Sequence, residues 1–223
     1  MKIYIGYDSR EDIAYQVSKY SVERLCDIPV EAINQQNLRD KNLYYRDVDA
    51  LASTEFSLTR FLVPYLNNYT GWVLFIDCDT VFIQNPKELF GLVDDNYALM
   101  CVKHDYNPTN TIKMDGKKQY VYPRKNWSSV MLFNCAHPSN KKLSLDTVNT
   151  ASPSFLHQML WLQDAEIGSI PKEWNWLTDW YSEPEDGKPK LLHYTEGGPW
   201  FEEYKNCNYA DVWLQLEQEY LRN

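Results

Sequence analysis

Short runs of apolar residues recur along the chain, and longer segments with helical spacing of apolar positions separate them. Runs of this length without polar alternation are typical of strands buried on both faces of a mostly parallel sheet. We therefore expect core strands at IYI (3–5), WVLFI (72–76), YALMCV (97–102) and VMLF (130–133).

Helical patterns lie between and after these runs. Ser9 and Asp12 match an N-terminal capping pattern, and the first predicted helix follows it. Pro64 is expected to kink or close the second helix, and the last helix is amphipathic. The predicted helices cover 10–25, 53–68, 153–163 and 209–221, and a further apolar strand leads to His193. This alternation of strands and helices indicates an α/β fold.

Length and composition narrow the class of protein. A chain of 223 residues can bury one sizeable core, so we expect a single domain over 1–223. A net charge of −9 disfavours nucleic acid as a partner, because phosphate backbones require a basic face. No apolar run approaches the roughly 18 residues of a membrane span, and the first residues lack a signal-peptide pattern.

The five cysteines are scattered, odd in number and without C-x-x-C spacing. This pattern argues against a disulfide framework and against a zinc knuckle. We expect a soluble protein in a reducing cytoplasm. Two polar, turn-rich stretches, 107–126 and 182–190, are expected to be surface loops.

The stretch LFIDCDTVFI at 74–83 places two carboxylates between apolar runs. If the strand continues through them, Asp77 and Asp79 point to the same side. Neighbouring carboxylates repel unless a cation or a proton lies between them, and ligands bind at the carboxyl ends of strands in open α/β sheets. The pattern predicts a site for Mg²⁺ or Mn²⁺. In the alternative interpretation both acids cap a β-turn.

The stretch KLLHYTEGGPWFE at 190–202 adds a histidine and a glycine-rich turn. His193 would supply an imidazole ligand that favours Mn²⁺ over Mg²⁺. Gly197 and Gly198 would let the backbone approach a diphosphate closely. The alternative is an ordinary core histidine before a tight turn.

Together these motifs resemble the GT-A-fold, nucleotide-sugar-dependent glycosyltransferases, in particular the family of glycogenin and the bacterial lipooligosaccharide galactosyltransferases. The resemblance implies one Rossmann-like GT-A domain with a mostly parallel sheet, a nucleotide-sugar half at about 1–103 and an acceptor half at about 104–223. The motifs that carry it are, in order, the strand ending at Asp8, TRFLVPYL (59–66), FIDCDTVFIQNPKELF (75–90), WSSVMLFN (127–134) and HYTEGGPW (193–200).

The resemblance also implies roles for individual residues. Asp77, Asp79 and His193 would hold the metal, and Tyr7 and Asp8 would contact the nucleotide base. Arg60 would reach the donor, although an ion pair on a helix surface is the alternative. Gly198 stands where the family usually has a lysine that holds the diphosphate. The residues expected at the donor are Tyr7, Asp8, Arg60, Asp77, Lys103, Asn126, Ser128, Ser129, Gly197 and Gly198.

Lys103 belongs to a locally basic stretch at 103–125, which would face either a diphosphate, an anionic acceptor or solvent. On the acceptor side, Gln158 corresponds best to the polar residue that touches the reacting sugar in the resembled family. Asp164 is the nearest carboxylate. Retention of configuration is implied, whereas inversion would require Asp164 or Asp179 as the base.

The expected activity is metal-dependent transfer of a sugar from a nucleotide sugar, with UDP favoured, to a glycan or another hydroxyl acceptor. A sugar-phosphate nucleotidyltransferase is a weaker alternative, because no glycine-rich phosphate loop follows the first strand. A noncatalytic carbohydrate-binding protein could use the abundant Trp and Tyr residues. It would not need the paired acids.

Overall fold

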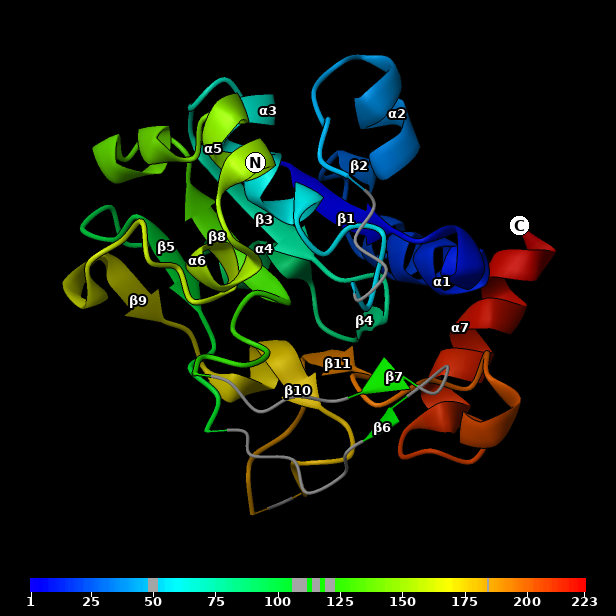
Figure 1. Ribbon diagram of the computed structural model, residues 1–223. Helices are drawn as coiled ribbons and strands as arrows, with labels where there is room; N and C mark the ends of the chain where they lie inside the picture. The colour runs from blue at the N-terminus through cyan, green and yellow to red at the C-terminus, as the bar shows by residue number, and fades with distance from the viewer. Residues whose placement is uncertain (48–51, 106–111, 114–116, 119–122, 184) are drawn as a thin grey trace.

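The computed structural model describes residues 1–47, 52–105, 112–113, 117–118, 123–183 and 185–223. Its main sheet has six strands in the order β2-β1-β3-β8-β5-β9 (Figure 1). Within this sheet only β8 runs against the others, so the α/β class and the mostly parallel sheet are confirmed. The strands are β1 (Ile3–Tyr7), β2 (Val30–Asn34), β3 (Trp72–Ile76), β5 (Leu99–Cys101), β8 (Val130–Asn134) and β9 (Ile167–Ser169).

A smaller sheet has the order β10-β11-β4. Its strands are β4 (Thr80–Phe82), β10 (Trp176–Leu177) and β11 (Leu191–His193). β11 is antiparallel to β4, with His193 opposite Thr80, and parallel to β10. The chain therefore leaves the main sheet at the end of β3 and enters the small sheet at β4 within a few residues. A separate antiparallel pair joins β6 (Ile112–Lys113) and β7 (Lys117–Lys118).

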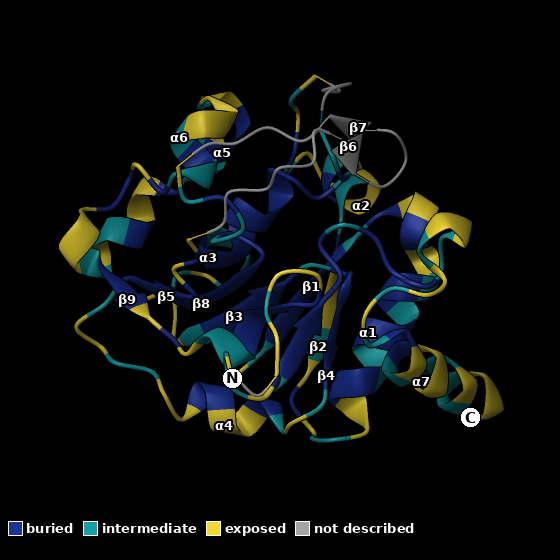
Figure 2. Cartoon of the chain, turned by 90° about the horizontal axis from the view of Figure 1, so that it is seen from below, coloured by how far each residue is buried: buried dark blue, intermediate teal, exposed yellow. Residues whose placement is uncertain are grey.

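Helices cover the main sheet, and they are coloured by burial in Figure 2. The predicted first and last helices are confirmed, and α1 and α7 pack side by side (Figure 1). The helices are α1 (Asp12–Glu23), α2 (Gln35–Asp40), α3 (Val63–Leu66), α4 (Pro86–Phe90), α5 (Leu145–Thr150), α6 (Pro153–His157) and α7 (Ala210–Arg222).

The helix predicted over 53–68 is wrong in extent. A 3₁₀ turn, Thr59–Leu62, leads into the short helix α3, and Pro64 lies in the first turn of α3 rather than closing the helix. Upstream, the Ser57 hydroxyl accepts a hydrogen bond from the Thr54 amide. Short polar side chains of this kind compete with the helical hydrogen bonds of the backbone.

The helix predicted over 153–163 ends early, at His157. Met159 has a φ of 54° and is fully buried. Trp161 packs edge-on against Phe61, and its indole donates to the Asn140 side chain at 3.1 Å. Burial of these two side chains is incompatible with a continued amphipathic helix, so tertiary packing overrides the local pattern.

The apolar core has two parts. The larger one surrounds the main sheet. The smaller one joins α1, α7 and the small sheet, and thereby fixes β11 against the C-terminal helix. Its buried members are Val17, Val81, Trp176, Leu192, Tyr194, Trp213 and Leu216.

Residues 182–190, apart from 184, contain no helix or strand. Most of the predicted loop 107–126 lies outside the described residues, and its described part holds the β6–β7 pair and a turn at 123–126. All five cysteines are free thiols. In the part of the chain that the structure describes, no helix is both long and apolar enough to cross a membrane.

Candidate active site

The predicted site residues gather at one edge of the main sheet. β1 and β3 are parallel, so Asp8 and Asp77 follow the two strands at the same edge. β8 is antiparallel to β3, so the residues that precede it reach this edge as well. The Asp77 amide donates to the Ser129 carbonyl at 2.9 Å. The reversed direction of β8 thus brings Ser128 and Ser129 beside the two acids.

The two acids lie in a turn and not within a strand. β3 ends at Ile76 and β4 begins at Thr80, so the predicted alternation of side chains along a continuous strand is wrong. The turn is held by the Thr80 hydroxyl, which donates to the Asp77 carbonyl at 2.8 Å, and by the Tyr194 amide, which donates to the Asp79 carbonyl at 2.9 Å.

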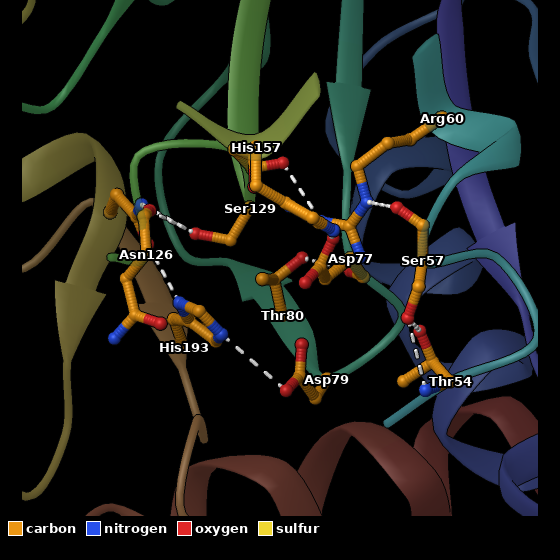
Figure 3. Close-up of polar contacts among 12 residues, drawn as sticks. Thr54, Ser57, Arg60, Asp77, Asp79, Thr80, Asn126, Ser129, His157 and His193 are labelled. Atoms are coloured by element: carbon orange, nitrogen blue, oxygen red, sulfur yellow. Dashed lines mark hydrogen bonds and ion pairs between the residues drawn. The ribbon is translucent and has the colours of Figure 1, made fainter. Parts of the chain in front are cut away.

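The turn nevertheless brings Asp77, Asp79 and His193 together. One ligand atom from each residue lies within 4.8 Å of the other two. Figure 3 shows His193 and Asp79 facing one another, with Asp77 close by. Two carboxylate oxygens and an imidazole nitrogen form a donor set that fits Mn²⁺ or Mg²⁺. The arrangement can hold a divalent cation.

Arg60 is buried, with 4% of its surface exposed. Its guanidinium donates to Asp77 Oδ1 at 2.6 Å and to the Ser128 carbonyl at 2.8 Å. It also lies 5.1 Å from the ring centres of Phe56 and Phe75. The alternative of a helix-surface ion pair is wrong, because Arg60 is an internal counter-charge of the site.

Burial destabilises negative charge at the turn. Burial raises the pKa of Asp77 to about 6, although the positive charge of Arg60 opposes the shift and the charge of Asp79 adds to it. Cys78, between the two acids, is 1% exposed, and burial raises the pKa of its thiol well above the usual range. Cys78 therefore stays a neutral thiol, and the negative charge of the site belongs to the carboxylates.

Asp8 is fully buried and already saturated with hydrogen bonds. Arg10 donates to both carboxylate oxygens, and the Glu55 amide donates to Oδ2 at 3.1 Å. The Tyr7 hydroxyl donates to Asp12 Oδ1 at 3.0 Å. Asp8 thus shapes the turn after β1, while its side-chain oxygens are committed to contacts within the chain.

The glycine-rich turn after His193 is packed against aromatic rings. A Cβ added to Gly198 would lie 1.9 Å from the Trp200 ring, and one added to Gly197, at a φ of 145°, would lie 2.7 Å from the Tyr204 ring. The absence of side chains here is therefore required by Trp200 and Tyr204.

Glu11 is a residue of this site that the sequence did not indicate. It is 3% exposed, and its carboxyl accepts a hydrogen bond from the Trp200 indole at 3.1 Å. Burial, with the charges of Asp79 and Asp8, raises the pKa of Glu11 to about 8. In the sequence Glu11 belongs to the charged stretch SRED, which is typical of an exposed turn.

The expected acceptor-side acids are exposed. Asp164 forms an ion pair with Arg124, whose guanidinium also donates to the Gln158 carbonyl at 2.7 Å. Asp179 accepts from the Asn208 side chain at 3.5 Å. The ammonium of Lys103 donates to the Ile167 carbonyl at 2.7 Å.

His157 lies beside Ser128 and within reach of the Arg60 charge. Its Nδ1 is 3.1 Å from the Ser128 hydroxyl, and its ring packs edge-on against Phe61. Burial and the charge of Arg60 lower the pKa of His157 to about 3, so it is a neutral imidazole. Of the tryptophans at 174, 176 and 180, Trp174 and Trp176 are buried and Trp180 is 42% exposed.

No protein-family model matches the chain. It is 53% identical over 224 residues to Protein CDI of Arabidopsis thaliana, an alignment that covers 98% of this chain and 86% of the relative. The chain belongs to the CDI family. The name of this relative states no activity.

Solved structures identify the fold of this CDI-family chain. The bifunctional glycosyltransferase WbbM superimposes with a TM-score of 0.68 and 16% identity, over 100% of this chain and 51% of WbbM. GlyE of Streptococcus pneumoniae gives 0.60 and 15%, over 99% and 62%. The chain thus spans about half and about three fifths of these two proteins.

The galactosyltransferase LgtC, crystallised with donor and acceptor sugar analogues, gives a TM-score of 0.61 and 13% identity. The alignment covers 98% of this chain and 96% of LgtC. These neighbours are glycosyltransferases of the GT-A fold, and the chain has this fold. Sequence identities of 13–16% establish a shared fold and nothing more.

Proposed function

We propose that this CDI-family protein is a glycosyltransferase. In this proposal it transfers a sugar from a nucleoside diphosphate sugar, with UDP as the favoured nucleotide, to a hydroxyl group of a glycan. The observation that carries the proposal is the cluster of Asp77, Asp79 and His193, with one ligand atom from each within 4.8 Å of the others, at the edge of a GT-A sheet. LgtC, which has the same fold, was crystallised with donor and acceptor sugar analogues.

Asp77, Asp79 and His193 would hold a divalent ion, with Mn²⁺ favoured over Mg²⁺ by the imidazole. When bound, the ion would stabilise the negative charge that develops on the departing diphosphate. Arg60 fixes the Asp77 carboxylate through a hydrogen bond of 2.6 Å. This contact holds the carboxylate in place before the ligand arrives and so lowers the cost of ordering the site.

The donor would lie along the edge formed by the end of β1, the turn at 77–79 and the residues before β8. Asn126 and Ser128 would offer polar groups there, while the Ser129 hydroxyl is engaged with the Asn126 carbonyl. His157 offers a neutral imidazole beside Ser128. The backbone at Gly197 and Gly198 would approach the diphosphate. Donor groups from the first 103 residues and from the rest of the chain would thus meet at one site, in keeping with a single domain.

Retention of configuration is the favoured stereochemistry. Asp164 is paired with Arg124, and Asp179 accepts hydrogen bonds from Thr178 and Asn208, so both carboxylates are engaged within the chain. In a retaining transfer the anomeric carbon–oxygen bond to the diphosphate breaks, the acceptor oxygen bonds to the same face of the anomeric carbon, and the departing phosphate accepts the acceptor proton. The anomeric configuration of the product, read by NMR, tests this assignment.

The activity is tested by incubating the protein with UDP-, GDP-, CDP- and ADP-sugars, with and without Mn²⁺, and measuring release of the nucleoside diphosphate. We expect release from one nucleotide class, dependent on Mn²⁺ and lost in Asp79→Asn. Asp27→Asn is the matched control, because Asp27 is an exposed acid paired with Lys87 away from the site. Mn²⁺-dependent release that persists in Asp79→Asn would contradict the proposal. Pyrophosphate formation from a nucleoside triphosphate and a sugar phosphate would favour a nucleotidyltransferase.

A further inference from the structure

The imidazole of His193 lies between two hydrogen-bond acceptors. Its Nδ1 is 2.8 Å from Asn175 Oδ1, and its Nε2 is 3.4 Å from Asp79 Oδ2. A neutral imidazole carries one N–H and one bare nitrogen. The side of the ring that holds the proton therefore decides whether Nε2 can act as a metal ligand.

The neighbours of Asn175 fix the orientation of its amide. Its Nδ2 donates to the Ser129 hydroxyl at 2.9 Å and faces the Asn126 carbonyl at 3.4 Å. The Ser129 hydroxyl donates its own proton to the same carbonyl at 2.7 Å. A backbone carbonyl can only accept, so the NH₂ group must face Asn126 and the Asn175 oxygen must face His193. Nδ1 of His193 is consequently the donor.

This network is closed to water and tied to the acids. Asn175 is 0% exposed, His193 2% and Ser129 3%. The Ser129 carbonyl accepts from the Asp77 amide at 2.9 Å, so one chain of hydrogen bonds connects Asp77 with His193. Figure 3 labels Asp77, Asn126, Ser129 and His193 of this network. In a dry interior such hydrogen bonds are strong, and an unpaired partner is costly.

We propose that Asn175 is the positioning residue of the metal site. It fixes the proton of His193 on Nδ1 and so directs the bare Nε2 toward Asp77 and Asp79. Histidines that bind metals are commonly held by an acceptor on their other nitrogen, which sets both the tautomer and the ring orientation. The inference rests on the proposed function only in that it assigns Nε2 to a metal ion.

Loss of the Asn175 oxygen would leave one acceptor for the imidazole proton. In Asn175→Leu, which has nearly the same shape, the proton moves to Nε2 and is donated to Asp79. The metal-binding nitrogen is then blocked. Asn175→Asp keeps an acceptor opposite Nδ1, so the Nδ1 proton is preserved, but its second carboxylate oxygen replaces the NH₂ group that donates to Ser129.

The matched control is Asn140→Leu. Asn140 is also 0% exposed, and its side chain makes hydrogen bonds with Ala98, Asn134 and Trp161, away from the acids. It reports the general loss of stability from replacing a buried asparagine. Near-ultraviolet circular dichroism identifies any variant that has lost its fold.

The first readout is the ¹⁵N spectrum of the histidine rings in metal-free protein at pH 8. The chain has only four histidines, and His193→Gln assigns the signal. We expect a proton on Nδ1 in wild type, Asn175→Asp and Asn140→Leu, and a bare Nδ1 in Asn175→Leu. A bare Nδ1 in wild type, or an Nδ1 proton that persists in Asn175→Leu, would overturn the inference.

The second readout is the Mn²⁺ dissociation constant, measured by electron paramagnetic resonance. We expect Asn175→Leu to weaken binding by about 10- to 100-fold, while Asn140→Leu binds like wild type. Equal affinity in Asn175→Leu and wild type would overturn the positioning role while the proposed function stands. A wild-type protein that binds no Mn²⁺ would overturn the metal-dependent function itself, whatever the tautomer.

Discussion

At the scale of single residues, the site is a set of buried charges that balance one another. Arg60 is the internal counter-charge of Asp77, and both side chains are largely shielded from solvent, at 5% and 14% exposure. Removing one partner of a buried pair leaves the other charge uncompensated, which costs far more than the pair contributes in net stability.

Replacing Arg60 with Met should therefore destabilise the metal-free protein by about 3–5 kcal/mol. Met keeps much of the volume between Phe56 and Phe75 but leaves the Asp77 carboxylate without its partner. Urea denaturation in the presence of a chelator measures the loss. The double variant Arg60→Met/Asp77→Asn should recover part of it. A loss below about 1 kcal/mol, the value of a surface ion pair, would contradict the assignment.

Glu11 provides a test by pH. Its folded pKa of about 8 lies above the ordinary value of 4.5. Between these two pH values the unfolded chain releases a proton that the folded protein retains, so stability falls as the pH rises. Glu11→Gln removes this dependence while it keeps an acceptor for Trp200. The variant should gain a few kcal/mol over wild type at pH 8, because one pKa unit corresponds to about 1.4 kcal/mol.

Thermal unfolding at pH 5 and pH 8 measures this difference. The gain in stability of Glu11→Gln over wild type should become smaller toward pH 5. The exposed control Glu23→Gln should show no such trend. A constant difference between Glu11→Gln and wild type across this range would show that Glu11 is ionised in the folded protein.

The metal-site residues are recognisable in the sequence, whereas the buried residues that support them are not. Asp77 and Asp79 stand in one short motif, and His193 precedes a recognisable turn. Asn175 and Glu11 matter only through contacts with residues distant in the chain, such as the bond between Glu11 and Trp200, 189 positions apart. No local pattern encodes such contacts.

At the scale of elements, the turn after β11 is docked onto the start of the chain. Trp200 reaches Glu11 and packs against Tyr194 and Trp213, with ring centres 6.0 and 5.2 Å away. Gly198 has no room for a side chain beneath this ring. The position of the turn over the site therefore depends on the Trp200 contact.

Gly198→Ala should displace Trp200 and destabilise the protein by about 1–3 kcal/mol, the usual cost of overpacking. It should also weaken nucleotide binding, because the turn shifts with the ring. Gly71→Ala is the control, since an added Cβ there meets nothing within 4 Å and only the backbone φ of 63° is unfavourable. Binding is measured by calorimetry with UDP and Mn²⁺. An unchanged affinity of Gly198→Ala for UDP would show that the turn does not contribute to nucleotide binding.

Helices and strands with a regular spacing of apolar residues were predictable from the sequence. Elements whose ends are set by tertiary packing were not. The apolar runs became the central strands, and the periodic ends of the chain became α1 and α7. The region 53–68 has apolar residues at helical spacing, yet Arg60 has to reach Asp77 and Phe56 has to enter the core. Those long-range demands break the helix into a turn and a short segment.

At the scale of the whole molecule, the site lies where the two sheets meet. The turn at 77–79 passes from the main sheet to the small one, and β11 brings His193 back to it from the far end of the chain. The small core that joins α1, α7 and β11 holds this arrangement. The sequence motifs predicted both sides of the site, whereas the way in which the two sheets share a turn emerged only in three dimensions.

The measurement that tests the central claim most directly is thermal stabilisation by UDP, GDP, CDP and ADP, each with and without Mn²⁺. A ligand at 100 times its dissociation constant stabilises the folded state by about 2.7 kcal/mol, which raises Tm by about 5–10 °C in a chain of this size. We predict such a shift for one diphosphate, only with Mn²⁺, absent in Asp79→Ala and retained in Asp27→Ala. A shift that is independent of Mn²⁺ and of Asp79, or no shift with any nucleotide, would contradict a metal-dependent nucleotide-sugar site at Asp77, Asp79 and His193.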